Sequence, residues 1–311
     1  MNAFILTHGG LIAAQIISAW LSTGNSVAAL WIDSRNPYRF LKQNRPPFGL
    51  APSAWSIAAM VQQYNIPVQR ITSWTDADIA FRQLSADVLI TAMTLQIIPE
   101  TTLSRFSGRA VNVHPSLLPY YRGPDPRVGM VLDGKANLYG GITLHCLSAQ
   151  VDRGDIIGFR RVPYEADRGF IYWEVCLARA AGELVQTELQ DYLNGTLRAR
   201  PQPAGAGSYR KVRRHELTLS DEHSAARTKW FCDQLGASGR LRFHTRKISY
   251  MVSGFVRRVG PCTSKAARIG KFTIEFDAAD ARVRVARHGI WTRLSRFVAY
   301  WLAIVRTHRT A

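Results

Sequence analysis

The chain has 311 residues, 47% of them hydrophobic and 20% charged, which allows two domains with a buried core and excludes a disordered or fibrous protein. Its net charge of +18 predicts a polyanionic partner such as RNA, a phosphorylated substrate or an anionic membrane surface, unless it serves only as a solvated basic face. No apolar run approaches the roughly 18 residues of a membrane span, and the first ten residues lack a basic leader. The four cysteines form no CxxC pair, so we expect neither a zinc cluster nor a disulfide framework, and a cytoplasmic protein.

Apolar β-type runs alternate with helical segments over the first 200 residues. Strands are predicted at 3–7, 26–32, 67–71, 86–92, 109–114, 139–147 and 156–162. Helices are predicted at 11–21, 52–64, 76–84 and 168–194, the last ending at Asn194-Gly195. This alternation predicts an α/β fold with an open, mostly parallel, doubly wound sheet.

A Pro/Gly/Ala-rich stretch at 200–208 has the composition of a linker. The charge changes at the same point, because residues 1–200 hold 18 Lys and Arg against 15 Asp and Glu, whereas residues 201–311 hold 22 against 7. We therefore predict an α/β domain over 1–199, a linker over 200–208 and a smaller basic domain over 209–311.

The basic domain is predicted to be β-rich. After a helix at 214–235, residues 241–286 read as strands and include a hairpin at 271–286 that turns at residues 278–280. Apolar residues recur at helical spacing over 290–306. Such an amphipathic helix either docks on the domain, which is the commoner outcome, or lies on a membrane surface.

The segment AVNVHPSLLPYYRGPDP (residues 110–126) carries the strongest chemical signal. Asn112 and His114 lie two apart in a predicted strand, so their side chains share one face, and Pro115 leaves His114 at the strand's carboxyl end, where α/β sheets bind ligands. An amide there can donate to an oxyanion, and an imidazole can move a proton near neutral pH. Asp152, just beyond another strand, is the candidate carboxylate. The alternatives are a structural histidine and an ordinary turn aspartate.

NVHPSLLPYYRG, followed some forty residues later by VDRGDII, resembles the folate-dependent formyltransferase family, which includes methionyl-tRNA, glycinamide ribonucleotide and amino-sugar formyltransferases. The resemblance implies an open parallel sheet, 10-formyltetrahydrofolate as the formyl donor and no metal. It implies that Asn112, His114 and Asp152 are the catalytic residues.

The same resemblance implies the binding residues. Those assigned to the folate are Ala92, Met93 and Thr94 along the pterin pocket and Tyr139, Gly140, Gly141 and Asp155 in the loop that closes over it. Those assigned to the floor between donor and acceptor are Ser116, Leu117, Leu118 and Pro119. Arg122 either contacts an acceptor phosphate or pairs with Asp125. Arg45 lies in a basic loop that meets RNA, covers the folate site or has no ligand.

Methionyl-tRNA is the favoured acceptor, because the length, the linker and the basic C-terminal half fit that branch of the family. HisGlyGly at 8–10, ProAspPro at 124–126 and AlaSerGlyArg at 237–240 depart from that branch. A nucleotide-linked amino sugar or another small biosynthetic amine is the alternative acceptor. A catalytically weak relative that binds RNA or membrane through the C-terminal half is the alternative of another class.

Overall fold

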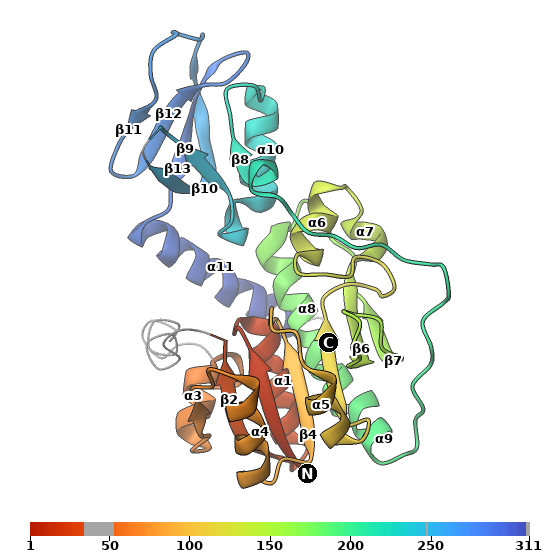
Figure 1. The fold of residues 1–311 in the computed structure, drawn as a ribbon. Coiled ribbons are helices and arrows are strands. Elements are labelled where there is room, and N and C mark those ends of the chain that lie inside the picture. Colours follow the sequence, from red (N-terminus) through yellow and green to blue (C-terminus); the bar gives the residue numbers. More distant parts are fainter. Residues whose placement is uncertain (34–52, 247, 309–311) are drawn as a thin grey trace. The chain divides into compact units, whose positions relative to one another are not determined.

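The computed structural model describes residues 1–33, 53–246 and 248–308, so Arg45 lies outside the described residues. The chain divides into two compact units (Figure 1). The first unit comprises Met1–Met130, Lys135–Pro163 and Glu174–Arg210, and the second comprises Val131–Gly134, Tyr164–Trp173 and Lys211–Ala311. Among the described helices, none is long and apolar enough to cross a membrane.

A seven-stranded sheet forms the centre of the first unit. Its strands are β1 (Asn2–Thr7), β2 (Ser26–Ile32), β3 (Val68–Gln69), β4 (Val88–Ala92), β5 (Ala110–His114), β6 (Gly141–Cys146) and β7 (Ile156–Arg161). Their order is β3-β2-β1-β4-β5-β6-β7. The first five are parallel, whereas β6 runs antiparallel to β5 and to β7. The predicted open, mostly parallel sheet is confirmed, with an antiparallel pair at one edge that the alternation of elements did not predict.

Helices cover both faces of this sheet (Figure 1). The helices of this part of the chain are α1 (Leu11–Ser22), α3 (Ile57–Gln63), α4 (Trp74–Gln83), α5 (Glu100–Leu103), α6 (Pro126–Leu132), α7 (Ala136–Tyr139), α8 (Gly169–Gln186) and α9 (Glu188–Leu193), with short 3-10 turns η2 (Ser53–Trp55) and η3 (Ser104–Phe106). Helix α1 lies against α8 on one face, where Gly182 faces Gln15 and Ala19. Ser73 caps α4 by accepting a hydrogen bond from the Asp76 amide.

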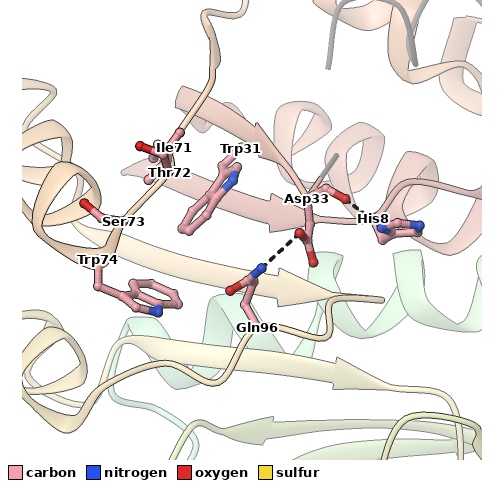
Figure 2. Close-up of a pocket in the computed structure, with 8 residues that line it drawn as sticks. All are labelled: His8, Trp31, Asp33, Ile71, Thr72, Ser73, Trp74 and Gln96. Carbon is pink, nitrogen blue, oxygen red and sulfur yellow. Dashed lines mark hydrogen bonds between the residues drawn. The ribbon is translucent and has the colours of Figure 1, made fainter. Parts of the chain in front are cut away.

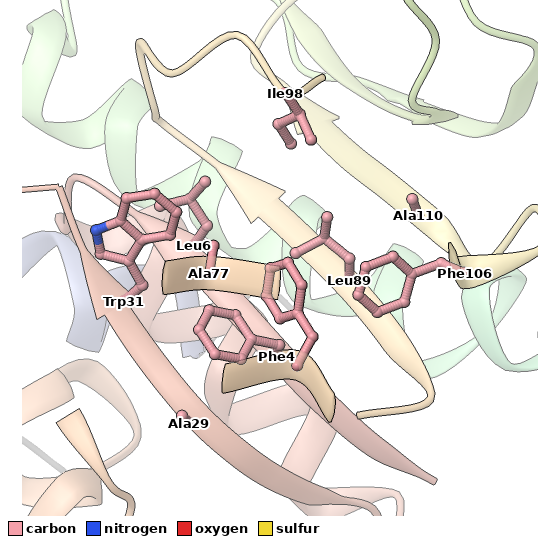
Figure 3. Packing of buried hydrophobic residues seen from close by; sticks show 10 residues of the cluster. Phe4, Leu6, Ala29, Trp31, Ala77, Leu89, Ile98, Phe106 and Ala110 are labelled. Carbon is pink, nitrogen blue, oxygen red and sulfur yellow. The ribbon is translucent and has the colours of Figure 1, made fainter. Parts of the chain in front are cut away.

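Between the opposite face and α4 lies an apolar core (Figure 3). Phe4 of β1 meets Phe81 of α4 edge-on, with ring centroids 4.6 Å apart, and Phe81 meets Phe106 in the same way at 5.2 Å. Each buried aromatic removes a large apolar area from water and contributes about 1.5–3 kcal/mol. This packing holds the parallel strands whose carboxyl ends carry the polar residues described below.

Two predicted elements are corrected in this unit. The helix expected over 168–194 breaks at Thr187, whose backbone leaves the helical region with φ of −112° and ψ of −87°. The strand expected over 139–147 begins only at Gly141, because Tyr139 ends the short helix α7.

The second unit is built on a six-stranded sheet of order β11-β12-β13-β10-β9-β8, which confirms the β-rich prediction. Its elements are η4 (Arg214–Leu217), β8 (Thr218–Leu219), α10 (Ala225–Leu235), η5 (Gly236–Ser238), β9 (Arg242–His244), β10 (Ser249–Gly260), β11 (Arg268–Ile269), β12 (Thr273–Asp277), β13 (Arg282–Arg287) and α11 (Ile290–His308). The predicted hairpin is formed by β12 and β13.

The single helix expected over 214–235 is wrong. A 3-10 turn and the strand β8 replace its first half, and α10 begins only after Ser224, whose hydroxyl accepts from the Arg227 amide. The run of Ser, Asp and His at 220–224 supplies turn and cap chemistry that stops a continuous helix. The predicted terminal helix is α11, which buries Ala303, Ile304 and Thr307 and leaves Leu294, Val298 and Trp301 at least 40% exposed.

Candidate active site

The carboxyl end of β5 brings a set of polar side chains together. Asn112 and His114 project from the same face of this strand, as predicted, and His114 is its last residue. Strand β6 lies alongside, with His145 directly opposite Asn112 and Thr143 opposite His114. Because β5 and β6 are almost wholly buried, these polar groups must find partners inside the protein.

Asp152 is the centre of this cluster. Its Oδ1 lies 3.6 Å from His114 Nδ1 and 3.7 Å from His145 Nε2. Its Oδ2 accepts a hydrogen bond of 2.8 Å from the Gly123 amide. Asp152 adopts a left-handed backbone conformation, with φ of 53°, which turns its carboxylate back toward the two imidazoles. The structure therefore brings together the three residues that the sequence pattern singled out.

The hydrogen bonds of the two histidines define which ring nitrogen carries the proton. His114 Nε2 lies 2.9 Å from the Tyr121 carbonyl oxygen, and since a carbonyl only accepts, Nε2 carries hydrogen. In the neutral ring, His114 Nδ1 then presents a lone pair toward Asp152. His145 donates from Nδ1 to the Cys146 carbonyl, so its Nε2 accepts from Asn112 Nδ2 at 3.0 Å.

The orientation of the Asn112 amide follows from the same network. Its Oδ1 accepts from the Thr91 hydroxyl at 2.8 Å, which leaves the amide nitrogen toward His145. An amide nitrogen carries two hydrogens, and the bond to His145 uses one of them. The second N–H is a donor suited to an oxygen that gains negative charge.

Burial and proximity set the charge states of His114 and Asp152. His114 is 4% exposed, and burial lowers its pKa although Asp152 opposes this effect. Burial alone would raise the pKa of the Asp152 carboxyl, but His114, His145 and the Gly123 amide outweigh it, so the pKa lies well below its ordinary value. At neutral pH the cluster therefore holds an ionised carboxylate beside a neutral imidazole, a pairing that can take up one proton at Nδ1.

Arg122 packs behind the Asp152 loop. The side chain is 7% exposed; Nε donates to the Asp152 carbonyl at 3.2 Å and Nη2 donates to Gln202 at 2.6 Å. Arg122 and Asp155 also line a pocket of about 460 Å³ formed with Arg153 and the segment 201–209. These contacts show that Arg122 positions the carboxylate loop, and its contact with a substrate stays a prediction.

The turn after β5 is held by Thr143. The Thr143 hydroxyl accepts from the Leu118 amide at 3.0 Å and donates to the Ser116 carbonyl at 2.7 Å. Leu117 donates its amide to the Tyr139 carbonyl, and a side chain on Gly141 would collide with Leu117 and with the Arg160 carbonyl. The predicted floor residues, Ser116 to Pro119, therefore lie beside Tyr139, Gly140 and Gly141.

The remaining predicted folate residues fall in two places. Ala92 ends β4, Met93 has a left-handed φ of 54°, and the Thr94 hydroxyl lies 3.4 Å from Asp33. Leu95 and Ile97, which follow them, are each 70% exposed. Asp155 lies beyond the opposite end of β6 from Gly141, where its carbonyl accepts from the Cys146 amide. Strand β6 thus separates Asp155 from the other residues assigned to the closing loop.

Residues 3–168, which contain Asn112, His114, His145 and Asp152, match the family described as Formyl transferase. The chain belongs to the formyl transferase family. This match confirms the resemblance carried by the motif at 112–123 and Asp152.

Proteins similar to this chain include methionyl-tRNA formyltransferases and sugar N-formyltransferases. Methionyl-tRNA formyltransferase of Bdellovibrio bacteriovorus is 33% identical over 149 residues, which are 47% of this chain and 46% of that protein, so the chain spans about half the length of this curated relative. A sugar N-formyltransferase from Shewanella has a similar fold, with a TM-score of 0.61, 15% identity and coverage of 83% of this chain and 99% of that one. The N-formyltransferase of Helicobacter canadensis, solved with folinic acid and dTDP-3-aminofucose, gives a TM-score of 0.55 at 15% identity and covers 92% and 98% of the two chains.

His145 is the site residue that the sequence analysis missed. It is 1% exposed and contacts both Asn112 and Asp152. A signal was present, because Thr143 and His145 are two polar residues on one face of a strand that is otherwise apolar. Their significance depended on the pairing of β6 with β5, which local patterning does not reveal.

Proposed function

We propose that this chain transfers a formyl group from 10-formyltetrahydrofolate to the amino group of methionyl-tRNA. The observation that carries the proposal is the convergence of Asn112, His114 and Asp152 at the carboxyl end of β5. Membership of the formyl transferase family supports the reaction class, and the curated relatives support this acceptor. The exposed apolar side chains of Leu95 and Ile97 suit the flat pterin of a folate.

The reaction replaces one carbon–nitrogen bond by another. The neutral amine attacks the formyl carbon, the bond to the acceptor nitrogen forms, and the bond to N10 of the folate breaks. The proton lost by the amine ends on N10. His114 takes this proton at Nδ1 and passes it on, because its Nε2 is held by the Tyr121 carbonyl.

Asp152 stabilises the imidazolium that forms in this step, since its ionised Oδ1 faces His114 Nδ1 at 3.6 Å. Asn112 donates its second N–H to the oxygen of the tetrahedral intermediate. His145 holds the Asn112 amide in this orientation by accepting the first N–H. Each group thus has one task, and the proton taken from the acceptor is returned to the leaving group.

The second unit supports an RNA acceptor. Residues 201–311, which include most of this unit, carry a net charge of +15, and Arg257, Lys265 and Lys271 are exposed on or beside the strands of the unit. Phe272 is 50% exposed next to Lys271, whose ammonium lies 5.3 Å from the ring centroid. Cations interleaved with an exposed aromatic suit a phosphate backbone and stacked bases.

The deciding experiment offers methionyl-tRNA, nucleotide-linked amino sugars and hydroxyornithine in parallel, each with 10-formyltetrahydrofolate. We expect formyl transfer to methionyl-tRNA and a steep loss of tRNA affinity as salt rises. The His114→Ala variant is the control for the chemistry. Transfer to another amine in preference to methionyl-tRNA would overturn the acceptor, and the absence of any transfer would overturn the reaction.

A further inference from the structure

Two pockets of the first unit differ in what lies beside them. The pocket at the carboxyl ends of β1 and β2, of about 580 Å³, is lined by Trp31, Asp33 and Trp74 among others, and none of its lining residues belongs to the cluster around Asp152 (Figure 2). The pocket of about 460 Å³ instead lies between the loop that carries Asp152 and residues 201–209. The second pocket therefore marks a segment, outside the family motif, that borders the catalytic cluster.

The backbone of residues 200–210, called the strap below, is fixed at both ends against the first unit. Arg200 exchanges two hydrogen bonds of 2.8 Å with Ile156, the first residue of β7. The Ser208 carbonyl accepts from the Arg122 amide at 2.9 Å, in the turn that follows β5. The strap therefore joins the chain after Asp152 to the chain after His114.

Gln202 spends its whole amide on the loop of Asp152. Its Oε1 accepts from Arg122 Nη2 at 2.6 Å, and since a guanidinium only donates, the amide nitrogen must face the other way. This Nε2 donates to the carbonyl of Asp152 and to the carbonyl of Gly154, each at 2.9 Å. The orientation of the half-buried Gln202 side chain is thus set by three partners.

The backbone that Gln202 holds is the one from which the catalytic carboxylate projects. Asp152 has a left-handed φ of 53°, a conformation that is uncommon for a residue with a side chain and that persists where surrounding contacts hold it. Its Oδ1 lies 3.6 Å from His114 Nδ1 only in this conformation. Loss of the two bonds from Gln202 would free this backbone to turn the carboxylate away from the imidazole.

Ser208 acts on the other member of the pair. Its Oγ accepts from the Tyr121 amide at 3.0 Å, and the carbonyl of Tyr121 accepts from His114 Nε2 at 2.9 Å. Tyr121 also has a left-handed backbone, with φ of 57°. The Ser208 hydroxyl therefore holds the residue that fixes the orientation and the protonated nitrogen of His114.

We propose that Gln202 and Ser208 are positioning residues for formyl transfer, which hold the Asp152 carboxylate and the His114 imidazole in register by binding the backbone behind each of them. The inference rests on the proposed function, because both residues act through the roles assigned there to His114 and Asp152. It gives the strap a part in turnover.

The first test is steady-state kinetics of formyl transfer from 10-formyltetrahydrofolate to methionyl-tRNA. Gln202→Ala should lower kcat about tenfold to a hundredfold and leave KM within about twofold, because a displaced catalytic group costs rate and not ground-state binding. Gln202→Glu keeps the size and can pair with Arg122 but has no N–H, so it should lose about as much. Gln150→Ala, which changes an exposed glutamine of the same loop, is the matched control and should be unchanged.

A double-mutant cycle separates positioning from a general loss of stability. If Gln202 acts through Asp152, adding Gln202→Ala to Asp152→Asn should lower kcat by no more than about twofold beyond Asp152→Asn alone. A contribution to stability alone would instead multiply the two losses. Thermal unfolding of each variant confirms that the folded chain is being compared.

Ser208 is tested by loss and rescue. Ser208→Ala should lower kcat several-fold at unchanged KM, and Ser208→Thr, which keeps the hydroxyl, should restore it. Ser104→Ala is the control, because the Ser104 hydroxyl is exposed and donates within its own turn.

Multiplied losses in the cycle, or full turnover in Gln202→Ala or Gln202→Glu, would overturn the role of Gln202. Equal kcat in Ser208→Ala and the unaltered chain would overturn that of Ser208. No transfer by the unaltered chain to any acceptor would overturn the reaction and this inference with it. Transfer to another amine would overturn the acceptor alone, and the same variants would then be measured with that amine.

Discussion

In the first unit the titratable groups of the cluster are buried, with His114 4% and His145 1% exposed, whereas in the second unit Arg257, Lys265 and Lys271 lie on the surface. The two buried histidines have fixed hydrogen-bond partners, and the pKa values of His114 and Asp152 are shifted, which suits proton transfer and charge stabilisation. Exposed cations attract an anionic partner over a long range, and dissolved salt screens this attraction. The difference teaches that changes in the first unit should affect turnover and that changes in the second should affect affinity.

The largest effect is expected from His114→Ala. This change removes the group that carries the proton, so kcat for formyl transfer should fall by about 10²–10⁴-fold. Steady-state kinetics at saturating acceptor measure the effect. Tyr64→Ala, an exposed aromatic at the end of α3, is the control and should be unchanged. Turnover within a fewfold of the original would contradict the role of His114.

Asn112→Ala should come next. It removes one donor to the tetrahedral intermediate, which is worth about 2.7–4 kcal/mol, so kcat should fall about 10²–10³-fold with a smaller change in KM. Asn112→Asp keeps the size of the side chain but not the N–H, so it should lose a similar amount. If KM rises while kcat is kept, Asn112 acts in binding instead.

A smaller effect, on affinity alone, is expected in the second unit. Replacing Arg257 and Lys271 together by Glu should raise KM for tRNA about tenfold and reduce the salt dependence of binding by about one phosphate contact per residue. The kcat at saturation should stay the same. Lys229→Glu is the control, because Lys229 already pairs with Asp233 on α10. Equal effects of the control and the double variant would show only general repulsion.

The smallest effect is expected in the pH dependence of stability. This dependence reports on the buried pair of His114 and Asp152 and not on the surface cations. The folded-state pKa of Asp152 lies below its unfolded value, so its stabilisation is present above about pH 4 and is lost as pH falls through the folded pKa. Urea unfolding between about pH 3 and pH 5 should therefore depend on pH less steeply in Asp152→Asn than in the original chain. Identical slopes would contradict this coupling.

The same cluster predicts the pH below which kcat falls. Burial lowers the pKa of His114, so the neutral base persists to a pH below its ordinary 6.5, and kcat should fall only below that value. A pH profile of kcat measures the midpoint. A midpoint above 6.5 would mean that the Asp152 charge outweighs burial.

Much of this protein follows from the sequence alone. The apolar runs and their spacing predict the parallel strands, Pro115 predicts that His114 ends β5, and the two-residue spacing predicts that Asn112 shares its face. The hairpin of β12 and β13 and the basic character of the C-terminal half also follow from it. These features depend on residues that are close in the sequence, so local periodicity and turn chemistry are enough to predict them.

The tertiary structure decided the rest. His145 joins the site because β6 pairs antiparallel with β5 and places it opposite Asn112. Asp152 reaches the imidazoles because its backbone is left-handed and the Gly123 amide, 29 residues away in the chain, holds its carboxylate. The pocket of Trp31, Trp74 and Asp33 joins segments more than 40 residues apart. Strand register and hydrogen bonds between distant segments set these arrangements. Periodicity within one segment therefore does not predict them.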